Sequence, residues 1–300
     1  MNAGQPAVLG IDIGGSSSRA RLSAGGKVIA ESEGAGANVA VLPAAVMERR
    51  VTALLAELGP ASPVACCAGA AGAEVRDARV RLEQLLVRLL PNCRVEVVHD
   101  TNLVLAAAGM DAGIALISGT GSVAYGRDRS GRESRAGGWG WLLGDEGSAT
   151  WLAREAAREV LRRAEAGEPA GALSEGLLAA VRVRGARELT GRLHTFREPR
   201  RWAALAHVVF EAAGADAGAE ALVDRAADGL SDLVERVRAE LSIQGPVVLA
   251  GGLLLNHARL ESAVRLRLGP ATLRLEEPPV AGAVTLAGRK NASGAMGGGQ

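Results

Sequence analysis

The sequence predicts an α/β protein built around a largely parallel sheet, and three observations support this fold class. Short apolar segments alternate with helical patterns through the first third of the chain. A glycine- and hydroxyl-rich turn between two apolar strands occurs twice, at residues 14–18 and 118–122. A buried-type strand at residues 246–250 follows a long stretch that is mostly helical. Since alternating strands and helices form parallel sheets, and since the turn recurs, we expect a duplicated α/β architecture.

The first copy begins with an apolar strand at residues 7–13, and an alternating segment at residues 19–22 returns after the turn. The next expected elements are a helix at about 43–58, a strand at 63–68, a helix at 79–90 and a strand at 95–98. This alternation indicates that the first domain carries a central sheet covered by helices.

The second copy begins with strands at residues 113–117 and 123–126, one on each side of the turn. Ser148 is a suitable N-cap for a helix at residues 149–166, because its hydroxyl can accept a bond from a helical amide. The remaining expected elements are helical segments at 174–184, 199–213 and 216–241, a strand at 246–250, helices at 256–266 and 280–290, and a frayed tail at 291–300.

The composition describes a globular protein that is large enough for two domains, with 48% hydrophobic and 22% charged residues among 300. The 34 basic residues nearly balance the 33 acidic ones, so no broad electrostatic field favours nucleic acid or an anionic membrane surface. The three cysteines lack the CxxC spacing of a zinc or iron–sulfur site. Without a signal-peptide pattern or an apolar run of roughly 20 residues, the chain is expected to be cytoplasmic.

Both glycine-rich turns place backbone N–H groups and short hydroxyls around one concavity, which is an arrangement that holds phosphate oxygens. The groups are Gly14, Gly15, Ser16 and Ser17 in the first turn, and Gly119 and Thr120 in the second. Neither is a P-loop, because both lack its lysine, and an ordinary hairpin turn is the alternative. Gly251 and Gly252 after the late strand either let a purine approach the backbone or make a tight strand-to-helix turn.

Two aspartates are candidates for the chemistry. Asp12 lies in the strand before the first turn, where Mg²⁺ carried by a nucleotide would compensate its charge; bonds to turn amides are the alternative. Asp100 follows a strand end, where ligands bind in open α/β sheets. It fits a base that accepts a hydroxyl proton in phosphoryl transfer, or a helix N-cap. His99 fits a structural or surface role, or the tuning of Asp100.

The glycine- and tryptophan-rich stretch at residues 137–148 is a candidate for sugar recognition. Asp145 and Glu146 offer acceptors for paired sugar hydroxyls, and Trp139 or Trp141 can pack against the apolar face of a sugar. The alternative for the acidic pair is a place at a helix N-terminus, stabilised by the helix macrodipole.

Five segments together resemble the N-acetylglucosamine kinase family: GIDIGGSSSRARL, HDTNLVLAAAG, LISGTGSVAYG, GGWGWLLGDEGSATWLAREA and VVLAGGLLLN. That family belongs to the BadF/BadG-type ATPase group of the sugar kinase, Hsp70 and actin superfamily, and the similarity covers about residues 7–290. It implies two ribonuclease-H-like lobes of the actin-like ATPase type with an interlobe cleft. The lobes would be residues 1–109 and 110–279, the second with a helical insertion, and the helix at 280–290 would pack back on the first.

The resemblance also implies roles for individual residues. Asp100 matches the catalytic base, which takes the proton of a sugar 6-hydroxyl. Ser16 and Thr120 match positions that contact ATP phosphates, and Gly251 and Gly252 match the turn on the nucleotide side. The positions that match sugar contacts are Asn38, Gly121, Gly138 and Asp145.

The implied activity is an ATP- and Mg²⁺-dependent transfer to the 6-hydroxyl of an amino sugar, in a homodimer. Ala40 stands where animal members carry an aromatic residue, so N-acetylglucosamine, glucosamine and a related hexosamine all stay open. One alternative is a BadF-type ATPase that activates a reductase through an iron–sulfur cluster, for which the cysteines lack the spacing. Another is a non-catalytic sugar sensor or an actin-like assembly protein.

Overall fold

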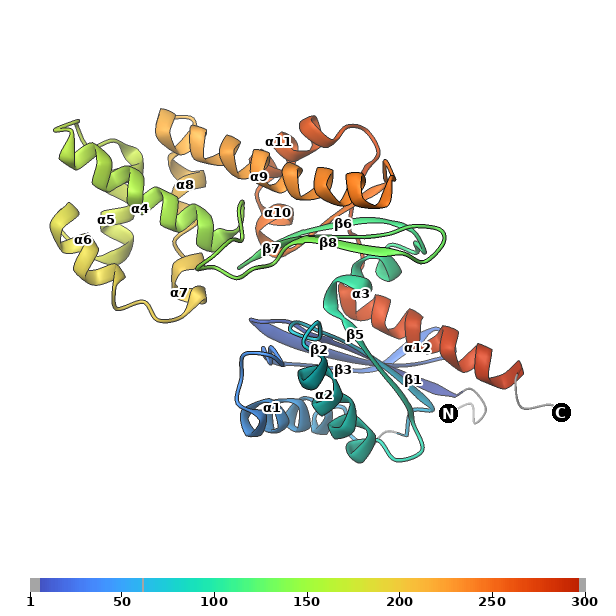
Figure 1. Ribbon diagram of the computed structural model, residues 1–300. Coiled ribbons are helices and arrows are strands. Elements are labelled where there is room, and N and C mark those ends of the chain that lie inside the picture. The colour runs from blue at the N-terminus through green and yellow to red at the C-terminus, as the bar shows by residue number, and fades with distance from the viewer. Residues whose placement is uncertain (1–5, 61, 297–300) are drawn as a thin grey trace. The chain divides into compact units, whose positions relative to one another are not determined.

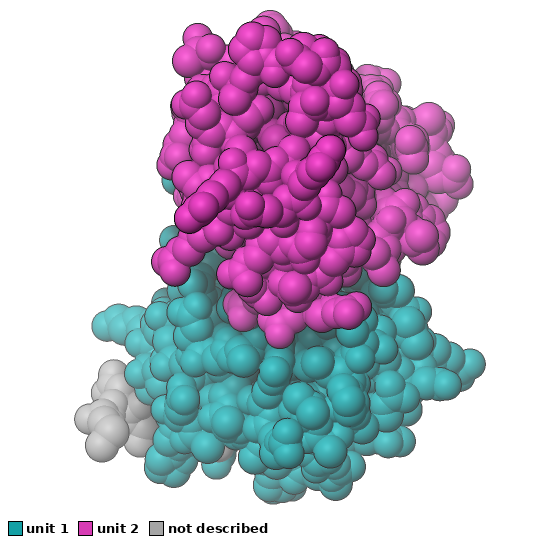
Figure 2. All heavy atoms as spheres, turned by 90° about the vertical axis from the view of Figure 1, so that its left-hand side faces the viewer, with its two compact units in different colours: residues 1–111, 275–300 teal, residues 112–274 magenta. Residues whose placement is uncertain are grey.

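The computed structural model describes residues 6–60 and 62–296, and these divide into two compact units. Unit 1 comprises Met1–Asp111 together with Leu275–Gln300, and unit 2 comprises Ala112–Arg274; Figure 2 gives each unit its own colour. Each unit has its own five-stranded sheet and its own hydrophobic core. The chain therefore leaves unit 1 once and returns to it with its last helix.

Unit 1 is built on a sheet with the strand order β3-β2-β1-β4-β5. β2 pairs antiparallel with β1 and β3, whereas β4 runs parallel to β1 and β5. The carboxyl ends of β1, β4 and β5 thus lie at the same edge, which is where Asp12 and Asp100 are found. The strands are β1 (Ala7–Ile13), β2 (Ser17–Ala24), β3 (Lys27–Ala35), β4 (Ala65–Ala70) and β5 (Arg94–His99).

The last helix of the chain packs directly on the sheet of unit 1 (Figure 1). Two glycines allow this close approach. A Cβ added at Gly10 would lie 2.5 Å from the backbone nitrogen of Val284, and one at Gly282 would lie 2.0 Å from the carbonyl oxygen of Leu103. The helices described in unit 1 are α1 (Ala44–Ala56), α2 (Arg76–Leu89), α3 (Asp100–Ala107) and α12 (Pro279–Met296).

The sheet of unit 2 repeats the order of the first, as β8-β7-β6-β9-β10. β7 is antiparallel to β6 and β8, and β9 is parallel to β6 and β10. Each sheet thus consists of an antiparallel three-stranded meander followed by two parallel strands, so the predicted duplication is confirmed. The strands are β6 (Gly113–Ser118), β7 (Ser122–Arg127), β8 (Glu133–Gly137), β9 (Val247–Ala250) and β10 (Thr272–Arg274).

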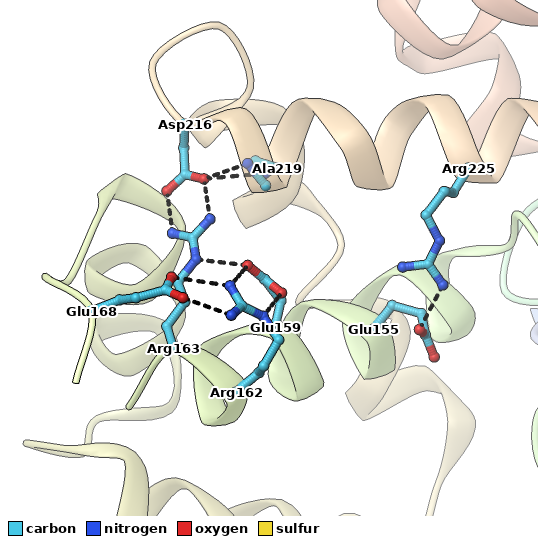
Figure 3. A network of polar contacts seen from close by, with 9 residues as sticks. Glu155, Glu159, Arg162, Arg163, Glu168, Asp216, Ala219 and Arg225 are labelled. Atoms are coloured by element: carbon cyan, nitrogen blue, oxygen red, sulfur yellow. Dashed lines mark hydrogen bonds and ion pairs between the residues drawn. The ribbon is translucent and has the colours of Figure 1, made fainter. Parts of the chain in front are cut away.

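Unit 2 also carries the helical region. Arg163 on α4 contacts both carboxylate oxygens of Asp216 at 2.8 and 2.7 Å, and Asp216 also caps the amides that open α9 (Figure 3). The same carboxylate accepts a bond from the amide of Leu173 on α5, so one aspartate joins three helices. The helices are α4 (Ala149–Glu165), α5 (Ala172–Val181), α6 (Ala186–Leu193), α7 (Pro199–Ala203), α8 (His207–Ala212), α9 (Ala217–Leu241), α10 (Gly252–Asn256) and α11 (Ala258–Leu268).

Most predicted elements are present, and the differences have local causes. The segment predicted as one helix at 199–213 is broken into α7 and α8, because the chain turns at 204–206 and buries Leu205. α10 begins at Gly252, before the helix predicted at 256–266. α12 continues to Met296, so residues 291–296 are helical rather than a frayed tail, while residues 297–300 lie outside the described residues. Within the described ranges, every helix is too short or too polar to cross a lipid bilayer.

Candidate active site

Asp12 lies near the carboxyl end of β1, in the middle of the unit 1 sheet. Its register neighbours are Arg19 on β2 and Gly69 on β4. Burial and the negative charge of Asp100 raise the pKa of Asp12 to about 7, against a smaller opposing effect of Arg19. Protein surroundings therefore disfavour the ionised form of Asp12, and a nearby cation would favour it.

Asp100 is the first residue of α3, directly after β5 ends at His99. His99 is the N-cap residue of α3, and its Nδ1 lies 3.3 Å from the amide nitrogen of Thr101. The carboxylate of Asp100 is therefore not used as the cap, which was the alternative to the catalytic interpretation. Its Oδ1 lies 2.9 Å from Nδ1 of His99, and 27% of the side chain is exposed.

The first glycine-rich turn is held from one side by the segment that follows β3. The amide of Gly36 donates to the carbonyl of Ser16 at 3.1 Å, and that of Ala37 donates to the carbonyl of Gly14 at 3.1 Å. A Cβ at Gly36 would lie 2.3 Å from the carbonyl oxygen of Gly15, so only glycine fits there. Gly15 and Ser17 remain exposed, and exposed donors of such a turn are able to bind a phosphate group.

Asn38 lies in the same region of unit 1, but part of its polar group is already occupied. Its Oδ1 accepts bonds from the amides of Ala40 at 3.0 Å and Val41 at 3.2 Å. The same oxygen packs against Gly72, where a Cβ would lie 2.6 Å away. Asn38 therefore shapes its own loop with the carbonyl oxygen, and only its amide group is left to donate to a sugar.

The second glycine-rich turn is tied to the start of α4. The amide of Ala149 donates to the carbonyl of Gly119 at 2.9 Å, and the hydroxyl of Thr150 donates to the carbonyl of Thr120 at 2.9 Å. Ser148 accepts a bond from the amide of Trp151 and so caps α4, as the sequence predicted. The turn is thus fixed beside a helix N-terminus, which favours negative charge.

Asp145 is buried beside this turn. Its backbone has a φ of 60°, which is uncommon for a residue with a side chain. Its carboxylate packs against Gly121, where a Cβ would lie 2.7 Å from Oδ2. Burial raises the pKa of Asp145, while backbone amide bonds from Ser122 and Gly140 oppose the rise. Since α4 begins only at Ala149, Asp145 and its neighbour Glu146 lie outside the first helical turn.

The two tryptophans of the glycine-rich stretch have different surroundings. The Trp139 side chain is 74% exposed, whereas the Trp141 ring packs 6.4 Å from the ring of Trp202. Gly138 beside them has a φ of 71° and accepts a long bond from Arg135. Trp139 rather than Trp141 therefore presents an aromatic face to solvent.

Gly251 and Gly252 lie next to the second turn. Gly251 has a φ of 94°, and a Cβ there would lie 2.3 Å from the carbonyl oxygen of Ser118, so a tight strand-to-helix turn is present. A Cβ at Gly119 would lie 3.8 Å from the amide nitrogen of Gly252. The turn at residues 118–122 after β6 and the Gly251-Gly252 turn after β9 therefore lie side by side in unit 2.

Sequence reasoning missed Glu74 and Thr150. Glu74 lies in the turn between β4 and α2, and its Oε2 is 3.1 Å from Nε2 of His99. Parallel pairing of β4 with β5 places Ala70 opposite His99, and this register brings Glu74 near His99 across 25 residues of sequence. The residues carry no motif, so only the strand order reveals the contact.

The residues present fit a hydrated magnesium ion rather than an all-protein metal cage. No group of three or more His, Cys, Asp or Glu side chains arranged to hold a metal occurs among the described residues. Asp12 supplies a carboxylate whose pKa is raised to about 7. Mg²⁺ commonly keeps several waters and binds through one or two carboxylates and substrate phosphates, so one such carboxylate is sufficient.

Two α/β units with a duplicated topology, each with a glycine-rich turn after its first strand, define an actin-like ATPase fold, so the predicted fold class is confirmed. The chain belongs to the BadF/BadG/BcrA/BcrD ATPase family, whose profile matches residues 9–284. A candidate N-acetylglucosamine kinase of known structure from Chromobacterium violaceum is similar over 94% of this chain and 99% of its own, with 28% identity and a TM-score of 0.76.

Two curated relatives match part of the chain. An N-acetylmuramic acid/N-acetylglucosamine kinase of Clostridium acetobutylicum is 34% identical over 164 residues, which is 52% of this chain and 53% of that protein. An N-acetyl-D-glucosamine kinase of Dictyostelium discoideum is 28% identical over 197 residues, which is 62% of this chain and 61% of that protein. The matches therefore span between about half and three fifths of these relatives.

Proposed function

We propose that the protein is an ATP-dependent sugar kinase that phosphorylates the 6-hydroxyl of an amino sugar, either N-acetylglucosamine or glucosamine. The observation that carries the proposal is Asp100, a partly exposed carboxylate at a strand end that is not used as a helix cap. Family membership supports the use of ATP, and the similarity to kinases named for N-acetylglucosamine supports a sugar as acceptor. A homodimer is part of the proposal, and light scattering on the purified protein tests it.

In the proposed reaction, Asp100 accepts the proton of the 6-hydroxyl while the hydroxyl oxygen forms a bond to the γ-phosphorus of ATP. The bond from that phosphorus to the β,γ-bridging oxygen breaks, and ADP leaves. Asp12 would hold Mg²⁺ through water, and the ion would neutralise charge on the phosphates.

Binding groups on both units orient the reactants in this proposal. The turns at 14–17 and 119–120 hold phosphate oxygens with amides and hydroxyls, and the Gly251-Gly252 turn lies on the nucleotide side. Asp145 accepts hydroxyl bonds from the sugar, with Asn38, Gly121 and Gly138 at the matching contact positions. Trp139 offers its exposed ring to the apolar face of the sugar.

The test is an ADP-release screen over hexoses and amino sugars, with ³¹P NMR to identify a 6-phosphate product. Asp100→Asn should lower kcat by about 10²- to 10⁴-fold, the usual contribution of a general base, and leave nucleotide binding intact. Asp77→Asn is the matched control, since Asp77 lies in the first turn of α2 as Asp100 lies in that of α3. Near-normal turnover by Asp100→Asn would exclude it as the base.

A second variant tests the sugar side. In Gly121→Ala, the new Cβ would lie 2.7 Å from Oδ2 of Asp145, so the carboxylate must move. We expect the KM for the sugar to rise about tenfold or more, since a hydrogen bond to a charged group is lost, while the KM for ATP changes less. An equal rise in both KM values would contradict the assignment of Asp145 to the sugar.

A further inference from the structure

His99 lies between two carboxylates in unit 1. Its Nε2 is 3.1 Å from Oε2 of Glu74, and its Nδ1 is 2.9 Å from Oδ1 of Asp100. The ring is only 16% exposed, and the hydroxyl of Thr101 lies 2.8 Å from the same Nδ1. Glu74 comes from the turn after β4, and His99 ends β5, so two adjacent strands supply the three groups.

The distances favour a ring that donates from both nitrogens. A carboxylate oxygen only accepts hydrogen bonds, so each short contact is favourable when the facing nitrogen carries a proton. The amide of Thr101 is farther from Nδ1, at 3.3 Å, than is the Asp100 oxygen at 2.9 Å. Glu74 and Asp100 together therefore favour the doubly protonated imidazolium, in which Nδ1 donates to Asp100 and does not accept from the Thr101 amide.

We propose that His99, anchored by Glu74, is a positioning residue that fixes Oδ1 of Asp100 and leaves Oδ2 to face the substrate hydroxyl. This inference rests on the proposed function, because it assigns His99 a role in the same proton transfer. A carboxylate held by one oxygen has a defined orientation, and orientation of the base is part of the rate of the chemical step.

The imidazolium also has an electrostatic consequence. The negative charge of Asp100 raises the pKa of Asp12, so the two carboxylates repel each other. A positive ring beside Asp100 offsets this repulsion through the attraction of opposite charges. Glu74, which is 46% exposed, does not belong to the phosphate or sugar groups, and its contact with Nε2 of His99 links it to Asp100.

The test separates positioning from helix capping. His99→Asn supplies an efficient N-cap for the Thr101 amide but lacks the positive charge and the ring that reaches Glu74. We expect kcat to fall about tenfold or more, with the KM values for ATP and sugar within about twofold and Tm nearly unchanged. A purely structural role predicts that His99→Asn turns over like the natural protein.

Glu74→Gln provides a second, more distant variant. We expect a smaller fall in kcat, of about threefold to tenfold, and the double variant His99→Asn/Glu74→Gln should be no slower than His99→Asn alone. Glu48→Gln is the matched control, because Glu48 is a similarly exposed glutamate paired with Arg88. Additive losses in the double variant would overturn the link through His99.

A spectroscopic readout is independent of turnover. In protein labelled with ¹⁵N-histidine, His99 should show two ring N–H signals at neutral pH, identified by their absence in His99→Asn. Glu74→Gln should shift the Nε2 signal, and Asp100→Asn should shift the Nδ1 signal. A singly protonated ring that neither variant perturbs would overturn the proposal. If the natural protein phosphorylates no sugar in the screen, the proposed function fails instead, whatever the ring signals show.

Discussion

Asp12→Asn should change how the stability of unit 1 depends on pH. The pKa of Asp12 is raised from its usual 3.8 to about 7, mainly by burial and then by the charge of Asp100. The folded state therefore binds a proton that the unfolded state releases between about pH 4 and pH 7. The contribution of Asp12 to stability is therefore largest below about pH 4 and is lost as the pH rises through 7. At about 1.4 kcal/mol per pH unit, the loss amounts to at most about 4 kcal/mol.

The asparagine variant removes this pH dependence, because its amide does not ionise. Without nucleotide or Mg²⁺, its free energy of unfolding should exceed that of the natural protein by a margin that grows from pH 4 to pH 8. Hydrogen exchange of the β1 and β4 amides is the suitable assay. All four tryptophans lie between residues 139 and 202, so tryptophan fluorescence reports on unit 2 instead.

Two further measurements test whether the pKa of Asp12 is raised. Asp100→Asn removes one cause of the raised pKa, so it should reduce the margin between natural Asp12 and Asp12→Asn. Addition of Mg²⁺ with ATP should stabilise the natural protein more than Asp12→Asn at pH 8, since the ionised carboxylate then gains a cation. A margin that stays constant from pH 4 to pH 8 would show that Asp12 titrates normally and would refute the argument.

Two other substitutions test the packing. Gly282→Ala places a Cβ 2.0 Å from the carbonyl oxygen of Leu103 and should destabilise unit 1 by about 2 kcal/mol or more in chemical unfolding. Gly288→Ala on the same helix is the control, because its Cβ meets nothing within 4 Å, and it should stabilise unit 1 by up to about 1 kcal/mol. Asp216→Ala leaves Arg163, 12% exposed, without its buried partner and should cost unit 2 about 3–5 kcal/mol by tryptophan fluorescence in denaturant (Figure 3). Arg163 holds the pKa of Asp216 well below its usual range, so this cost should shrink as the pH falls below about 4.

The sequence predicted the strands with an apolar run or a clear alternation, including the edge strand β5, and missed the other edge strands β3, β8 and β10. β4 is buried along its whole length, and its apolar run was therefore visible as a strand. β3 was missed because it is an edge strand, with exposed Val28 and Ile29 and with Glu31 and Glu33 paired to arginines of β2. An exposed edge needs no clean alternation of apolar and polar residues, so the usual signal is absent.

For the candidate site, the sequence located the groups but did not decide between their roles. From the sequence, Asp100 fitted either a base or a helix cap, and the structure separates the two because His99, not Asp100, is the N-cap residue of α3. From the sequence, Asp145 fitted either a sugar ligand or an acidic residue at a helix N-terminus. The second role is excluded because α4 begins only at Ala149. Glu74 had no signal, since its contact with His99 depends on the pairing of β4 with β5.

The second glycine turn shows how three consecutive residues can serve two reactants under the proposed function. Gly121 lies against the carboxylate of Asp145, on the side assigned to the sugar. Gly119 and Thr120 are bonded through their carbonyls to the start of α4, on the side assigned to phosphate. Because both sides belong to one short turn braced by a helix, a shift of either group moves the other. Such a turn fixes the acceptor hydroxyl relative to the phosphoryl group, and that orientation is what an in-line transfer requires.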